Sequence, residues 1–104
     1  MTAQAHPHLR KEAVLQTLRA HWPELRELGV VHLDLVGSLA SDEARVGSDV
    51  DLIVDFDPAP DLTGFFDLVE RLEMLLGVHV DLMSRKGLRP HWRSHFEATA
   101  VRVA

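Results

Sequence analysis

Three aspartates have the type and spacing to hold a divalent metal ion. Asp49 and Asp51 lie in the segment DVDLIVDF, whose alternating apolar residues predict a strand over 49–56. Side chains two residues apart leave the same face of a strand, about 6.6 Å apart at the backbone. Two carboxylates at that spacing can converge on hard ions such as Mg²⁺, which prefer oxygen ligands. Asp81 is the third candidate, because it lies on the polar side of a predicted strand over 78–82.

The three carboxylates would meet on one surface if these two predicted strands are neighbours. Such a cluster repels itself when empty and gains stability when a cation binds. The alternative is a solvated sheet face, which antiparallel sheets often have. We expect that solvated position for Asp34 and Asp55, which share the polar alternation but not the spacing of the other three.

A Gly37-Ser38 pair falls where a predicted strand over 30–36 gives way to a short helix. Glycine allows a phosphate to approach the backbone closely, and a serine hydroxyl with free backbone N–H groups can bind it. Ser38 alone would also be explained as a helix cap. Together with the aspartates, the pair fits phosphoryl or nucleotidyl transfer, in which metal ions orient phosphates and activate an attacking hydroxyl.

The remaining pattern predicts an α/β fold, with helices between the strands. Apolar residues recur at helical spacing over 7–28, with a new turn at Pro23, and again over 61–76, between a cap at Asp61 and a stop at Gly77. We interpret the stripe on the second of these helices as core: Leu62, Phe65, Phe66, Val69, Leu72 and Leu76. That helix would form a crossover connection between strands. A last helix begins near Pro90, and the final VRVA fits a helix or a strand.

Composition excludes several classes of protein. The chain has 104 residues, no cysteine and a net charge of −5. We therefore expect one domain over 1–104, no disulfide or cysteine-zinc site, and no direct binding of nucleic acid. No apolar run reaches the roughly 20 residues that a membrane span needs, and residues 1–13 show no signal-peptide core, which favours a cytoplasmic location.

The segment LVGSLASDEARVGSDVDLIVDF, at 35–56, resembles the signature of the polymerase-β-like nucleotidyltransferase superfamily. That signature is Gly-Ser, a spacer of about ten residues, and Asp-x-Asp inside an apolar strand, and Asp81 in VDLM matches its third acidic residue. The short length is similar to the minimal nucleotidyltransferases, or MNT proteins. The likeness spans residues 10–100, with its specific part in these two blocks.

This resemblance implies a fold, a reaction and a partner. The fold would be a small mixed β-sheet packed with helices. The activity would be transfer of AMP from ATP to a HEPN-type RNase toxin, with the chain serving as antitoxin in a hetero-oligomer. Asp49, Asp51 and Asp81 would be catalytic and would hold two Mg²⁺ ions, while Gly37 and Ser38 would hold the β- and γ-phosphates. The chain has no tyrosine of its own to modify.

Two residues depart from the family pattern. Related sequences read Gly-Ser-x-Ala-Arg-Gly, whereas this chain has Ser41 and Asp42 in place of the arginine and glycine. Losing a cation and gaining an anion beside a triphosphate should weaken nucleotide binding, unless Arg45 compensates. The alternative function is therefore a catalytically impaired module that neutralises its partner by contact alone. A small-molecule transferase is a third reading, against which the absence of an acceptor-binding domain counts.

Several other residues have plainer interpretations. His91 and His95 have a metal-compatible spacing, but we expect a solvated helical face. His79 adjoins the proposed site and is expected to be a surface histidine. Trp22 and Trp92 fit either core edges or partner contacts. A basic group follows the third predicted strand and fits either phosphate contacts or an exposed loop: Arg85, Lys86 and Arg89.

Overall fold

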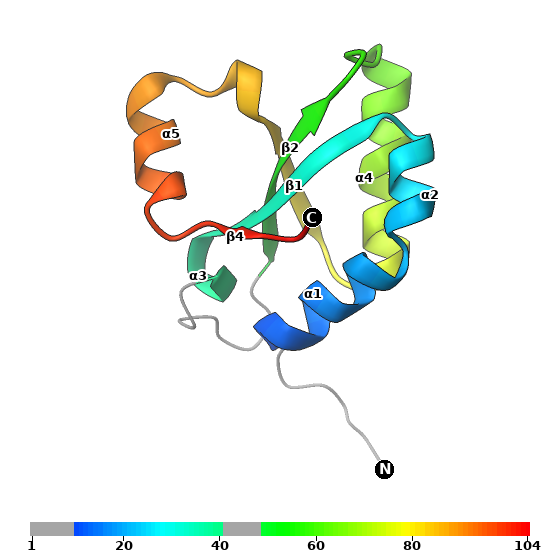
Figure 1. The fold of residues 1–104 in the computed structure, drawn as a ribbon, viewed down its shortest axis with the longest axis horizontal. Coiled ribbons are helices and arrows are strands. Elements are labelled where there is room, and N and C mark those ends of the chain that lie inside the picture. Colours follow the sequence, from blue (N-terminus) through cyan, green and yellow to red (C-terminus); the bar gives the residue numbers. More distant parts are fainter. Residues whose placement is uncertain (1–9, 41–48) are drawn as a thin grey trace.

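The computed structural model describes residues 10–40 and 49–104. Figure 1 shows a sheet with helices on both of its sides. The helices are α1 (Lys11–Ala20), α2 (Trp22–Glu27), α3 (Gly37–Ala40), α4 (Leu62–Leu76) and α5 (Pro90–Glu97), with a 3₁₀ turn η1 (Arg85–Gly87). The strands are β1 (Val30–Val36), β2 (Val50–Phe56), β3 (Val80–Ser84) and β4 (Val101–Arg102). The expected α/β class is confirmed.

The four strands form one mixed sheet in the order β3-β2-β1-β4. β1 pairs antiparallel with both β2 and β4, and β2 pairs parallel with β3. Parallel neighbours need a crossover, which α4 supplies as predicted. The end of the chain, for which a helix and a strand were both open, forms β4 beside β1.

Local sequence signals set the helix ends. The Asp61 carboxylate accepts a hydrogen bond from the backbone N–H of Gly64 at 2.8 Å, which caps α4 as expected. Gly77 ends the helix with φ +72°, a conformation that glycine adopts without steric cost. β3 begins at Val80, two residues later than predicted. The backbone N–H of Val80 donates a hydrogen bond to the Glu73 carboxylate at 2.9 Å.

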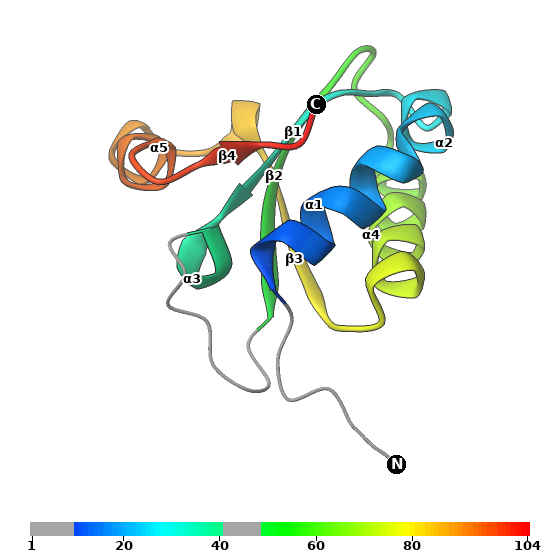
Figure 2. The ribbon, with the colours of Figure 1, turned by 60° about the horizontal axis from the view of Figure 1, so that its bottom comes forward.

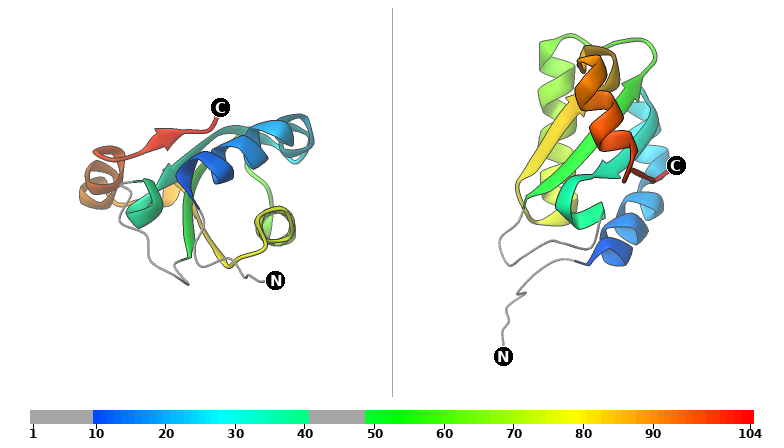
Figure 3. Two further views of the ribbon diagram at one scale, coloured as in Figure 1. Left: turned by 90° about the horizontal axis from the view of Figure 1, so that it is seen from below. Right: turned by 90° about the vertical axis from the view of Figure 1, so that its left-hand side faces the viewer.

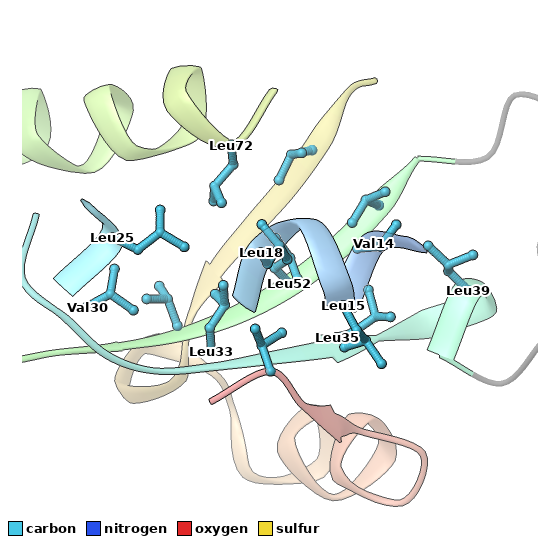
Figure 4. Packing of buried hydrophobic residues seen from close by; sticks show 14 of the residues in the cluster. Val14, Leu15, Leu18, Leu25, Val30, Leu33, Leu35, Leu39, Leu52 and Leu72 are labelled. Atoms are coloured by element: carbon cyan, nitrogen blue, oxygen red, sulfur yellow. The ribbon is translucent and has the colours of Figure 1, made fainter. Parts of the chain in front are cut away.

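The main hydrophobic core lies between the sheet and three helices, α1, α2 and α4 (Figure 2). Fully buried leucines from both layers meet there, as Figure 4 shows: Leu18, Leu25 and Leu72 from the helices, and Leu33, Leu35 and Leu52 from the strands. Burial of this kind stabilises by about 25 cal/mol per Å² of apolar surface.

The interpretation of the whole α4 stripe as core is wrong at its N-terminal end. Leu62 and Phe66 are 70% and 58% exposed, whereas Leu68 and Leu72 are fully buried. The core contacts of this 15-residue helix run from Leu68 to Leu76, so Leu62 and Phe66, in its first two turns, extend past the core. None of the helices in the described ranges is long and apolar enough to span a membrane.

The opposite face of the sheet holds a buried ion network centred on Asp34. Asp34 is only 4% exposed, and its carboxylate accepts hydrogen bonds from Arg85 and Arg102. Arg85 Nε also donates to both carboxylate oxygens of Asp55, at 3.0 and 3.1 Å. The expectation that Asp34 and Asp55 are solvated is therefore wrong, because the basic residue just after β3 folds back over this face.

The same arginine ties α5 to the sheet. Arg85 Nη1 donates to Glu97 Oε1 at 2.7 Å, and Arg93 Nη2 donates to the carbonyl oxygen of Arg85 at 3.1 Å. Figure 3 shows α3 and α5 on the side of the sheet away from α4. No residue of α5 is fully buried, so polar contacts hold this helix more than apolar packing does.

Replacing Asp34 with alanine should lower the free energy of unfolding by about 3 kcal/mol, because Arg85 and Arg102 lose a buried carboxylate partner. Urea denaturation of both proteins at pH 7 measures the difference. Asp67→Ala, on the exposed surface of α4, is the matched control and should change stability by less than about 0.5 kcal/mol. Equal stability of the two variants would contradict a buried network.

Candidate active site

Strand register brings Asp51 and Asp81 side by side. The parallel pairing of β2 with β3 aligns these two residues directly, and neighbouring strands lie about 4.8 Å apart. The backbone N–H of Val50 donates to the carbonyl oxygen of His79 at 3.1 Å, which fixes the start of β2 against β3. Of the three carboxylates expected to meet on one face, the strand register brings two together, Asp51 and Asp81.

Gly37 lies directly against Asp51. Val36, the last residue of β1, pairs with Asp51, so the chain turns into α3 at the level of this carboxylate. Gly37 has φ +78°, and a Cβ placed there would clash with Asp51 Oδ2 and lie 3.3 Å from its Cγ. Glycine is thus required for both backbone conformation and space. Ser38 is the second residue of α3, and its side chain lies outside the described structure.

Burial and nearby negative charge raise the pKa of the Asp51 carboxyl group. Its pKa is raised to about 6 by burial first, then by the charges of Asp81 and Asp49, and by a hydrogen bond between the Asp51 and Asp81 carboxyl groups. Each of these effects favours the neutral form of Asp51. A bound cation would act in the opposite direction, because it would neutralise the repulsion and favour the carboxylate.

Asp49 contacts a histidine at the rim of the site. Asp49 Oδ2 lies 3.4 Å from His79 Nδ1, and His79 Nε2 lies 3.9 Å from Glu73 Oε2. The side chains of Asp49 and His79 are 49% and 63% exposed, so solvent screens the pair and it contributes little stability. His79 is a surface residue as expected, and it contacts an aspartate of the candidate site.

The donor set fits a hard divalent cation. Within residues 10–40 and 49–104, no group of three or more acidic, histidine or cysteine side chains is already gathered around a common metal position. Mg²⁺ does not require such a cage, since it keeps several waters and takes ligands from one or two carboxylates and from substrate phosphates. Asp51 and Asp81 supply that minimum, and the missing Cβ of Gly37 leaves space that the Asp51 carboxylate occupies.

The basic residues after β3 and the residues that depart from the family pattern are not part of this described carboxylate site. Arg85 is already paired with carboxylates of the ion network around Asp34. In the described structure, no carboxylate lies within ion-pair distance of Lys86 or Arg89. The departures from the family pattern, Ser41 and Asp42, and the compensating candidate Arg45 lie outside the described residues.

Comparison with known proteins identifies the class. Residues 18–102 match the family model described as a nucleotidyltransferase domain. The protein adenylyltransferase MntA of Thermococcus cleftensis is 44% identical over 82 residues, covering 78% of this chain and 83% of the relative. A solved structure of a proposed minimal nucleotidyltransferase superposes with a TM-score of 0.78 at 35% identity, over 90% of this chain and 96% of that one.

The chain therefore belongs to the nucleotidyltransferase domain family, in its minimal form. The same fold occurs in the MNT antitoxin of Shewanella oneidensis, solved in complex with its tri-AMPylated HEPN toxin. That structure superposes with a TM-score of 0.64 at 17% identity, over 86% of this chain and 71% of the other. The expected nucleotidyltransferase fold is confirmed.

Replacing Asp51 with asparagine should stabilise the protein at neutral pH. The carboxyl group has a native pKa of about 6, above its ordinary value of 3.8, so the native state binds its proton more tightly than the unfolded state does. The contribution of Asp51 to wild-type stability should therefore fall as pH rises from about 4 to 7. The variant should gain about 1 kcal/mol above pH 6.5, after allowance for solvent screening, and nothing below pH 4.

Chemical denaturation of both proteins between pH 4 and 8, without divalent ions, measures this difference. Asp67→Asn is the control for removing a charge far from the site. A pH-independent gain, or a loss at neutral pH, would contradict the proposed repulsion.

Gly37→Ala should destabilise more than Gly77→Ala. Both glycines have positive φ, which costs alanine about 1 kcal/mol, but nothing lies within 4 Å of a Cβ at Gly77. The additional loss at Gly37 isolates the clash with Asp51, and we expect about 1 kcal/mol more. Urea titrations of the two variants give the comparison. Equal losses would show that the Asp51 carboxylate is free to move away.

Proposed function

We propose that this protein transfers AMP from ATP to a hydroxyl group of a partner protein, a HEPN-type toxin, and acts as its antitoxin in the cytoplasm. The observation that carries the proposal is the alignment of Asp51 with Asp81 on adjacent parallel strands, with Gly37 pressed against Asp51. A carboxylate pair beside a glycine turn, with the pKa of Asp51 raised, fits handling of a metal-bound triphosphate.

Each site residue has a proposed role. Asp49 and Asp51 would hold two Mg²⁺ ions, and Asp81 would complete the ligand set. The ions supply positive charge that orients the phosphates and stabilises the transition state. Gly37 and Ser38 would hold the β- and γ-phosphates, Gly37 by letting them approach the backbone closely and Ser38 by its hydroxyl.

The reaction is a displacement at the α-phosphorus of ATP. The acceptor hydroxyl oxygen forms a bond to that phosphorus, and the bond from phosphorus to the oxygen bridging the β-phosphate breaks. Pyrophosphate leaves with the electron pair. Asp81 would accept the hydroxyl proton and release it to water, because its carboxylate lies at the edge of the sheet and is exposed.

The choice of acceptor is supported by the names of related proteins. The Thermococcus cleftensis relative is named a protein adenylyltransferase, and the Shewanella oneidensis neighbour is an antitoxin whose toxin carries three AMP groups. A partner of the HEPN type is therefore the first acceptor to test.

Asp49→Asn and Asp51→Asn should each reduce AMP transfer at least 100-fold while preserving the fold, because both remove a proposed metal ligand. The assay incubates the protein with the product of its neighbouring gene, as the candidate HEPN-type acceptor, together with Mg²⁺ and ATP, and follows the intact mass of both chains. Asp67→Asn should retain full activity. Wild-type activity in either site variant would refute the mechanism.

A binding module that neutralises its partner by contact alone is the second candidate. Ser41 and Asp42, which replace the arginine and glycine of related sequences, favour it. Under this alternative, wild type adds no AMP, and Asp51→Asn still forms the complex and protects cells from the toxin. Asp42 is then the first residue to revert.

A further inference from the structure

Helix α5 presents an aromatic surface that nothing in the described structure covers. Trp92 is 48% exposed, and its ring stacks on Phe96 with centroids 5.9 Å apart. His91 and His95 lie against the same indole, at 5.1 and 5.9 Å. A helix with a stacked aromatic cluster and no fully buried residue has an unpartnered face.

The charge of this segment is opposite to that of the rest of the chain. Residues 82–96 contain no acidic residue but four basic ones: Arg85, Lys86, Arg89 and Arg93. The whole chain has 11 basic and 16 acidic residues, so the remainder has 7 and 16, a net charge of −9. Lys86 and Arg89 are exposed and have no ion-pair partner among the described residues.

Residues 82–96 are anchored on the face of the sheet that carries Asp51 and Asp81. Asp51 and Asp55 are four residues apart on β2, so their side chains leave the same face, about 13 Å apart along the strand. Arg85 binds Asp55 and also Glu97 of α5. A protein bound on α5 would therefore lie over the same face of the sheet as Asp51 and Asp81, and an acceptor loop would need to span about 13 Å from the Asp55 anchor to reach them.

We propose that α5 and η1 form the docking surface for an acidic segment of the acceptor protein, an inference that rests on the proposed function. Trp92 would be its apolar centre, since tryptophan and arginine are enriched among the residues that dominate binding energy. Lys86 and Arg89 would pair with the partner's carboxylates and direct its approach. Charge complementarity thus defines the partner as locally acidic.

The size of the basic group favours a protein over a nucleic acid. Proteins that bind nucleic acid at physiological salt commonly make about 6 to 10 phosphate contacts. Because Arg85 is paired with Asp34 and Asp55, only three basic residues of this segment remain to bind phosphate: Lys86, Arg89 and Arg93. The net charge of −9 on the rest of the chain would also repel a long polyanion.

Two variants test the surface: Trp92→Ala, and Lys86→Glu combined with Arg89→Glu. The probe is the product of the neighbouring gene, tested as the HEPN-domain protein that accepts AMP, with binding measured by titration calorimetry and AMP transfer by mass spectrometry. Each variant should weaken the Kd about tenfold or more and raise the KM for the acceptor to match, with kcat within about twofold of wild type. A structural defect in the active site would lower kcat instead.

Matched controls come from the opposite side of the sheet. Met74→Ala removes a side chain that is 71% exposed on α4, and Arg26→Glu reverses an exposed charge on α2. Neither should change the Kd by more than about twofold. Thermal unfolding of every variant verifies that the fold is intact.

The outcomes separate this inference from the proposed function. If wild type adds no AMP but the α5 variants lose binding, the docking surface stands and the reaction fails. Wild-type affinity in both variants, or no binding by wild type, overturns the docking surface. It is also overturned if a fluorescent 20-nucleotide single-stranded RNA binds wild type but not the double variant, while the Kd for the HEPN-domain protein stays unchanged.

Discussion

The parallel pairing of β2 with β3 is the constraint on which the site depends. It aligns Asp51 with Asp81, and β1 brings Gly37 to the same level from the other side. The core behind the sheet keeps this register, because a slip of one residue would turn buried Leu52 and Val54 toward the opposite face. Apolar packing on one face thus holds like charges together on the other.

Much of this arrangement is predictable from sequence. The alternation in DVDLIVDF defines β2 and the face of its aspartates, and the long apolar helix after it favours a crossover connection, which the parallel pairing of β2 with β3 confirms. Capping and stop residues, Asp61 and Gly77, locate α4. These predictions succeed because each depends on short-range chemistry that a few neighbouring residues determine.

The ion network was not predictable in the same way. Asp34 and Asp55 alternate with apolar residues as solvated residues do, and only the fold shows that Arg85 returns to cover them. The prediction that Leu62 and Phe66 belong to the core also failed, because helical spacing alone does not say how far the sheet extends beneath the start of α4. Long-range contacts decided both cases, and local patterns carry no information about them.

Two clusters of charged residues on this face of the sheet, one around Asp34 and one around Asp51, affect stability in opposite directions. Around Asp34, unlike charges compensate each other, so most substitutions there lower stability. Around Asp51, burial and the like charges of Asp81 and Asp49 raise the pKa, so keeping this residue ionised at neutral pH lowers stability. A duplicated copy under no selection at the site would therefore tend to lose Asp51 before it lost the Asp34 network. In such a copy the scaffold should outlast the carboxylate pair, because stability alone favours the first and opposes the second.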